Sequence, residues 1–192
     1  MRIVIDMQGA QASNRQRGIG RYTLSLAQAI ARERGGHEVV LVLNGQFPET
    51  IDPIRVAFES LLPKEGIRVW SCPCPVNQLS GDHDARRKSA ELIRAAYLSS
   101  LAPDVLLVTS LFEGLVDDAV TSVRSFERTP LTAVVLYDLI PLIHRSTYLQ
   151  NPVVERWYLD KLKHLQQADL LMSISESSGQ EAQDHLEMPR SA

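Results

Sequence analysis

The chain has few of the residues and patterns that define several classes of protein. Only two cysteines occur in 192 residues, Cys72 and Cys74, and Pro73 separates them. Thiols this close do not favour a mutual disulfide, and two thiolates do not complete a zinc site. No apolar run approaches the about 20 residues that a transmembrane helix needs, and no secretory leader follows Met1. We therefore expect a reduced, cytoplasmic protein.

The chain also has little excess charge of either sign. Lys and Arg number 20 against 23 Asp and Glu, which gives a formal net charge of −3. A nucleic-acid-binding protein normally has a basic surplus, so this balance argues against that class. Hydrophobic residues make up 44% of the chain and no block of like charge occurs, which excludes intrinsic disorder. The length suits one domain with a full core.

Short apolar runs rich in Val, Ile and Leu recur along the chain. Several of them are continuously apolar, which is typical of a sheet that is buried on both faces. The predicted strands are Arg2–Asp6, Val39–Leu43, Ile67–Ser71, Val105–Thr109, Thr132–Tyr137 and Leu170–Ile174.

Segments with helical spacing separate these strands. The predicted helices cover about Gly20–Arg34, Pro53–Leu62 after an Asp52 N-cap, Asp84–Leu101, a stretch from Asn151-Pro152 onward, and Glu176–Leu186. Alternating strands and helices imply right-handed crossovers and a parallel sheet with helices on both faces. The predicted fold is therefore α/β, a single Rossmann-like, doubly wound, mostly parallel sheet.

The segment between the first strand and the first helix is the most informative. It ends in the glycine motif Gly18–Arg21, where the helix begins. Glycines at a helix start let backbone N–H groups approach an anion, which the helix dipole also favours. Arg15 and Arg17 add positive charge nearby, and ligands of such sheets bind at the carboxyl ends of the strands. We predict an anion site here; the alternative is a glycine pair that only starts the helix.

The same segment does not match the fingerprint of a nicotinamide-dinucleotide site. The glycine pair lies about a dozen residues beyond the strand, Thr23 replaces the third glycine, and the second strand ends in Asn44 and not in an acid. A nicotinamide oxidoreductase is therefore a remote interpretation, which a titration with reduced nicotinamide would test.

Asp138 is a second candidate, because it follows the fifth predicted strand at the same edge of the sheet. Its carboxylate either projects toward the glycine motif or caps backbone N–H groups of its own loop, and both interpretations stay open. The five histidines show no ligand spacing. We expect no metal and no cofactor, and no Walker phosphate loop or nucleophile elbow occurs.

In order along the chain, these motifs resemble the N-terminal half of retaining GT-B glycosyltransferases of the group 1, or family 4, type. The resembling segments are Arg2–Asp6, Gly18–Tyr22, Tyr137–Leu142 and Ala168–Ser178. The Tyr-Asp-Leu-Ile-Pro form is similar to bacterial mannosyl- and rhamnosyltransferases of polysaccharide and O-antigen biosynthesis.

The resemblance implies that residues 1–192 form the acceptor-side domain of a split enzyme. The donor-binding C-terminal domain would lie outside this chain, which would then be inactive alone. The whole enzyme would move a hexose, mannose or similar, from a nucleotide-sugar to a polysaccharide or lipid-linked acceptor with retention. The implied substrate-binding residues are Gly18, Ile19, Gly20, Arg21, Tyr137 and Asp138. No catalytic residue is assigned. If Gly20 contacts the donor diphosphate, we expect Gly20→Val to cut turnover while the domain stays folded.

Tyr137 departs from the pattern of the resembled group, many of whose members carry a histidine before the aspartate. A phenol can still donate a hydrogen bond, but the role of a histidine does not transfer to it. Lipid-linked acceptors imply the cytoplasm or the cytoplasmic face of the inner membrane, with peripheral association. The basic run Arg86–Lys88 is better explained as a solvated helix face. The alternative function is a stand-alone α/β module that binds a small phosphorylated ligand.

Overall fold

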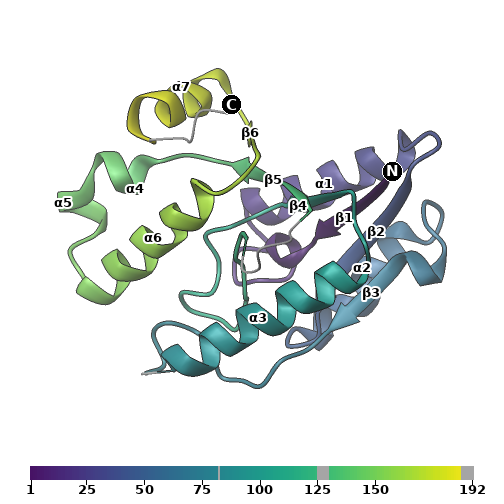
Figure 1. The fold of residues 1–192 in the computed structure, drawn as a ribbon, viewed down its shortest axis with the longest axis horizontal. Helices are drawn as coiled ribbons and strands as arrows, with labels where there is room; N and C mark the ends of the chain where they lie inside the picture. The colour runs from purple at the N-terminus through teal and green to yellow at the C-terminus, as the bar shows by residue number, and fades with distance from the viewer. Residues whose placement is uncertain (82, 125–129, 187–192) are drawn as a thin grey trace.

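A six-stranded, all-parallel sheet forms the centre of the molecule in the computed structural model, which describes residues 1–81, 83–124 and 130–186 (Figure 1). Its strand order is β3-β2-β1-β4-β5-β6. The strands are β1 (Arg2–Asp6), β2 (Glu38–Asn44), β3 (Ile67–Trp70), β4 (Val105–Val108), β5 (Leu131–Leu136) and β6 (Leu170–Ser173). Each predicted strand is confirmed to within one residue at either end. The order reverses between β1 and β4, the place at which such sheets bind ligands.

Helices cover both faces of this sheet. They are α1 (Gly18–Arg32), α2 (Pro48–Phe58), α3 (Asp84–Ser100), α4 (Ile140–Ile143), α5 (Arg145–Tyr148), α6 (Pro152–Leu165) and α7 (Glu176–His185), with short 3-10 turns η1 (Gln8–Ala10) and η2 (Lys64–Gly66). Figure 1 shows α3 and α6 on one side of the sheet and α1 on the other. The α/β, Rossmann-like, single-domain prediction is confirmed.

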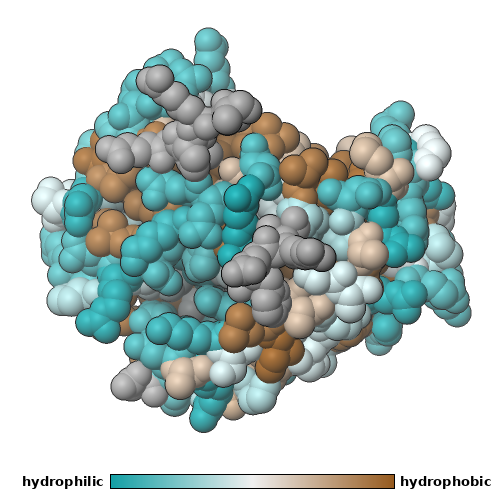
Figure 2. Space-filling model, in the orientation of Figure 1, coloured by the Kyte–Doolittle hydropathy of each residue, from teal (hydrophilic) through white to brown (hydrophobic). Residues whose placement is uncertain are grey.

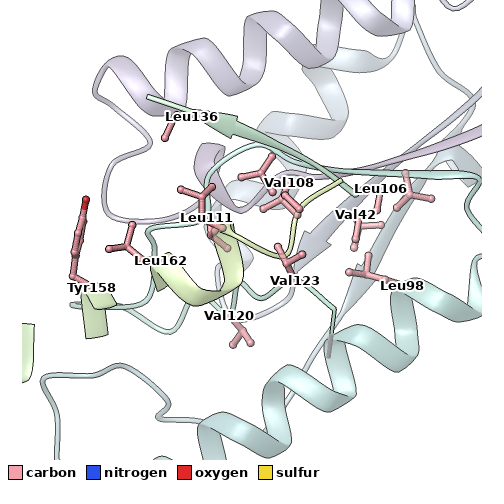
Figure 3. Close-up of a cluster of buried hydrophobic side chains, with 14 of the residues drawn as sticks. Val42, Leu98, Leu106, Val108, Leu111, Val120, Val123, Leu136, Tyr158 and Leu162 are labelled. Carbon is pink, nitrogen blue, oxygen red and sulfur yellow. The ribbon is translucent and has the colours of Figure 1, made fainter. Parts of the chain in front are cut away.

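The core is divided between the two faces because successive side chains of a strand point to opposite sides. In β1, Val4 packs with residues of α3 and α6, whereas its neighbour Ile5 packs with residues of α1 and α2. The same alternation runs along the other central strands, so both faces are apolar, as the continuous apolar runs indicate. Figure 3 shows the α3 and α6 side of this core, with Leu98 and Leu162 directed toward side chains of the sheet and of the segment after β4.

The prediction of a helix from Pro53 to Leu62 with Asp52 as N-cap is wrong. The helix α2 begins at Pro48, with Phe47 as its N-cap, and Pro53 lies inside it. Pro48 therefore takes the first-turn position at which proline is tolerated, and Pro53 removes one backbone hydrogen bond from the helix interior. Contacts from elsewhere hold the early start, since the buried Thr50 hydroxyl accepts from Gln11 Nε2 at 2.8 Å.

The predicted starts of the last two long helices are confirmed by their caps. The Asn151 side chain accepts from Val153 N at 2.9 Å at the start of α6, and Ser175 Oγ accepts from Ser178 N at 3.1 Å at the start of α7. Ser178 Oγ in turn donates to the carbonyl of Tyr137 at 2.7 Å. The helix α7 is thereby tied to the carboxyl end of β5.

Both cysteines are free thiols, Cys72 buried and Cys74 half-buried. Burial raises the pKa of both, that of Cys74 to about 12, so neither has the character of a reactive thiolate. Across the described ranges, no helix is long and apolar enough to cross a membrane.

Candidate functional site

A buried polar network closes the carboxyl end of β1. Asp6 forms an ion pair with Arg94 of α3, whose Nε donates to Asp6 Oδ2 at 2.9 Å, and both side chains are almost fully buried. The Gln8 amide donates to the same carboxylate and to the carbonyl of Val120, and it accepts from Asn44 Nδ2 at 3.0 Å. The acid at the end of the first strand is therefore fully engaged with the protein. We call this buried network of Asp6, Gln8 and Arg94 the floor, because it lies below the surface at this edge of the sheet. Asp6 does not offer a ligand group.

The segment after β4 forms one wall of the site. Its turn passes through Gly114, whose φ is +87° and at which an added Cβ would overlap the carbonyl oxygen of Ala119, so a side chain is excluded. Asp117 accepts from Ser13 N at 2.7 Å, and Asp118 accepts from Val76 N at 2.7 Å. The wall is thus attached both to the segment before α1 and to the segment after β3.

The glycine motif lies at the start of α1, as predicted. Arg17 is the N-cap residue but makes no side-chain capping bond. Among the described residues, no group accepts a hydrogen bond from the backbone N–H of Gly18, Ile19 or Gly20. Gly18 is exposed and Ile19 half-buried, so their amides, at the positive end of a fifteen-residue helix, are accessible to an anion, whereas Gly20 is buried.

The two glycines of this motif serve different purposes. A Cβ on Gly18 would meet nothing within 4 Å, whereas one on Gly20 would overlap the backbone carbonyl of Arg15. Gly20 is required by the close approach of the preceding loop, so Gly20→Val would disturb the fold. The expectation that this variant leaves the domain folded is wrong, and Gly18 is the position at which the anion site can be probed.

The three arginines near the motif do not act together. Arg15 turns away toward Glu49, 3.5 Å from its carboxylate, and its charge is partly neutralised there. Arg17 borders a cavity described below, and Arg21 is exposed on the first turn of α1. Positive charge at the helix start therefore comes from Arg17 and Arg21.

Tyr137 joins the end of β5 to the glycine motif. Its hydroxyl lies 3.1 Å from the carbonyl oxygen of Thr109 and 3.4 Å from that of Ile19, and its ring meets Tyr22 edge-on at 5.6 Å. Burial raises the pKa of Tyr137 to about 12, so the phenol stays protonated and donates. The structure thus brings Tyr137 and Ile19 together.

Asp138 is exposed at the same edge and caps its own loop. Its Oδ1 accepts from Ile140 N at 3.0 Å, at the start of α4. Among the described residues, no hydrogen bond joins Asp138 to the glycine motif, and its second carboxylate oxygen has no donor. The capping interpretation is confirmed for one oxygen, and the ligand interpretation stays a prediction for the other.

A cavity of about 380 Å³ lies beside the segment that leads into α1; we call it the loop cavity. Its lining includes Asn14, Arg17, Phe112, Glu113 and Trp157. Sequence reasoning missed Asn14, Glu113 and Trp157, which come from three distant segments. The one available signal was Glu113 itself, a lone acid in an otherwise apolar run after a strand.

Glu113 is a buried carboxyl group on the wall of this cavity. It is 2% exposed and accepts from Ser110 Oγ at 2.8 Å and, at 3.4 Å, from Asn14 Nδ2. Burial raises its pKa to about 7, although the two hydrogen bonds oppose the shift. A carboxyl group that titrates near neutrality on a cavity wall can both accept and donate hydrogen bonds, which marks a candidate ligand-binding group.

Together these elements define an α/β domain with a candidate ligand site at the point where its strand order reverses. One end of the site offers unbonded helix amides to an anion, and the other offers a cavity with amide, carboxyl and indole groups. Such a site can hold a phosphorylated group next to a polar, hydroxyl-bearing one.

The chain is similar to the serotype-specific mannosyltransferase WbdA of Escherichia coli. It is 33% identical to one such protein over 189 residues, which is 98% of this chain and 22% of the relative. Two further proteins of the same name and organism are 31% and 30% identical, each over 85% of this chain and 20% of the relative. These matches support a relationship to glycosyltransferases.

The chain spans only about a fifth of the length of these curated relatives. No protein-family model matches the sequence.

Proposed function

We propose that this chain is the acceptor-side domain of a retaining GT-B glycosyltransferase. In our proposal the whole protein moves mannose or a similar hexose from a nucleotide-sugar to a saccharide or lipid-linked acceptor, at the cytoplasmic face of the inner membrane. The observation that carries the proposal is the 33% identity, over 98% of this chain, to a protein named a mannosyltransferase. The site supports it, because a donor diphosphate and an acceptor sugar need an anion site beside a polar cavity.

The start of α1 would act on the leaving diphosphate. In sugar transfer, negative charge grows on this group as the bond to the anomeric carbon breaks. The accessible N–H groups of Gly18 and Ile19 would donate to it, with Arg21 adding charge, and preorganised donors of this kind stabilise a transition state strongly.

Tyr137 and Asp138 would contact the sugar side of the reaction. The Tyr137 hydroxyl already donates within the protein, so it offers a substrate its oxygen lone pair and the edge of its ring. Asp138 offers its second carboxylate oxygen to a sugar hydroxyl. The loop cavity would hold the acceptor and place its hydroxyl against the donor, which adds the contribution of proximity.

This domain forms one wall of such a site, and we propose that it does not complete turnover alone. The activity is therefore best tested in a chimera in which this chain replaces the matched segment of the E. coli relative. The purified chimera is assayed for hexose transfer from guanosine-diphosphate mannose to mannose-containing acceptors, and the isolated chain is assayed in parallel.

The informative variant is Gly18→Val, matched by Gly36→Val. Neither glycine has a neighbour within 4 Å of an added Cβ, so both positions have room for a side chain, and the fold of each variant is checked by circular dichroism. Gly18→Val places a branched side chain over the helix amides and should lower turnover by about 10²-fold, the loss that follows removal of a preorganised donor. Gly36→Val should have no effect.

Equal turnover of the two variants would contradict a role for the helix start in diphosphate binding. Transfer by the isolated chain would contradict the proposal that it is inactive alone. The unbonded amides also favour a second candidate, a stand-alone module for a phosphorylated ligand. Tight binding of inorganic phosphate by the isolated chain, together with an inactive chimera, would favour that candidate.

A further inference from the structure

A second cavity adjoins the loop cavity. We call it the interhelix cavity; its volume is about 300 Å³, and it lies between α3, α6 and the segment after β4. Glu113, Gly114 and Trp157 border both this cavity and the loop cavity. Figure 2 shows the hollow between α6 and α3 bordered by hydrophilic surface.

Two buried ionisable groups of opposite sign line the interhelix cavity. Lys161 of α6 is 7% exposed, and its ammonium group donates to the Thr121 hydroxyl at 2.8 Å and to the Thr121 carbonyl. No ion pair joins it to Glu113 within the described part of the chain. Burial lowers the pKa of Lys161 to about 8, as it raises that of Glu113 to about 7. Burying two such groups without direct pairing costs stability, which is typical of a binding site.

The outer lining of the cavity carries both signs of charge in close alternation. Lys88 and Glu91 of α3 and Arg156 of α6 line this space. Arg87, which pairs with Asp84, and Asp160, which pairs with Lys163, also line it. An anionic ligand would be repelled by the carboxylates, and a cationic ligand would be repelled by the lysine and arginine side chains. A neutral ligand rich in hydroxyl groups can instead accept hydrogen bonds from the cations and donate to the carboxylates, which gives it strong charge-assisted bonds.

We propose that the interhelix cavity is a second saccharide subsite, which holds an uncharged hexose unit of a glycan whose neighbouring unit lies in the loop cavity. Trp157 borders both cavities, so its ring would pack against the hexose unit in the interhelix cavity where that unit joins its neighbour. Glu91, Lys161 and Glu113 would bind its hydroxyl groups. The choice of a mannose-containing glycan as the ligand rests on the proposed function; the existence of the subsite rests on the cavity and its charges.

The test is a titration of the 192-residue chain with methyl α-mannoside and with a linear mannotetraose. Binding is measured by calorimetry and by perturbation of backbone amide signals. The tetrasaccharide should bind more tightly than the monosaccharide, and it should perturb the amides of Glu91, Thr121 and Lys161.

Two variants and a control make the test specific to the interhelix cavity. Lys161→Met removes the buried ammonium, and Glu91→Gln removes a charge from the half-buried outer lining without loss of size. Each should weaken tetrasaccharide binding about 10-fold, the effect of losing one hydrogen bond to a charged group. Lys64→Met, outside both cavities, should leave binding unchanged. Glu91→Gln keeps the test valid if Lys161→Met does not fold.

The possible outcomes separate this inference from the proposed function. Tetrasaccharide binding that Asn14→Ala weakens but neither interhelix variant affects would overturn the second subsite and leave the proposed function intact. Binding of inorganic phosphate at the amides of the interhelix cavity would overturn it in favour of an anion site. No binding of either saccharide would also overturn it, while transfer by the chimera would still decide the proposed function.

Discussion

The carboxyl ends of β1 and β4 are neighbours in the sheet, and a buried carboxyl group lies near each of them in a different environment. Asp6, at the end of β1, is paired with Arg94 and receives further hydrogen bonds from Gln8. Within the described part of the chain, Glu113, beyond β4, accepts hydrogen bonds only from the Ser110 hydroxyl and, at 3.4 Å, from Asn14, and it borders two cavities. The charge of Asp6 is balanced by Arg94 inside the protein, whereas Glu113 keeps hydrogen-bonding capacity for a ligand. Burial alone therefore does not identify a functional acid; the partners around it do.

The largest expected effect on stability comes from breaking the buried ion pair of Asp6 and Arg94. Arg94→Met leaves the Asp6 carboxylate buried without its counter-ion, which should lower the free energy of unfolding by about 3–5 kcal/mol. Denaturant unfolding of the variant beside Arg86→Met measures the difference; Arg86 is exposed and donates to the carbonyl of Pro75. A loss below about 1 kcal/mol would mean that the floor does not depend on the pair.

The next effect comes from the titration of Glu113. Its pKa of about 7 in the folded chain lies above the ordinary value of 4.5, so the folded state keeps a proton that the unfolded state has already released. The contribution of Glu113 to the free energy of unfolding is therefore largest below pH 4.5. It decreases by about 3 kcal/mol in total as the pH rises through 7.

Glu113→Gln removes this dependence without a change of size. The difference in the free energy of unfolding between the variant and the parent chain should therefore increase in favour of the variant from pH 4.5 to pH 7. Urea unfolding at a series of pH values measures it. A constant difference across this range would show that burial does not raise the pKa of Glu113 in the folded chain.

The smallest effect concerns Asp138, the exposed acid after β5. The substitution Asp138→Asn keeps an oxygen that can accept from Ile140 N, so it should change the free energy of unfolding by no more than about 0.5 kcal/mol. In the chimera, the same variant should lower hexose transfer, because the second carboxylate oxygen is lost. An unchanged transfer rate would leave Asp138 with its capping role only.

The fold could be predicted because the strands are marked by short, continuous apolar runs. The same reasoning failed for α2, where Asp52-Pro53 has the pattern of a helix start but contacts of Thr50 with Gln11 place the start earlier. It also gave no indication of the short helices α4 and α5. Local patterns do not contain the contacts that decide such cases.

Only the part of the site that carries a local sequence pattern could be predicted. The start of α1 carries a local glycine pattern, and its position at the ligand edge follows from the strand order. Glu113, Trp157 and Lys161 carry no such pattern, because they become neighbours only when the segment after β4 packs against α6. Residues that form a cavity from distant segments are not visible in the order of the chain.

Gln8 has a consequence for the order of events during folding. Its amide bonds both the N–H and the carbonyl of Val120, a residue 112 positions further along the chain. Contacts across such a separation require the closure of a very long loop, which is slow and entropically costly. We therefore expect the floor of the site to assemble after the sheet has begun to form. Substitutions at Gln8 should then mainly accelerate unfolding and leave the folding rate nearly unchanged.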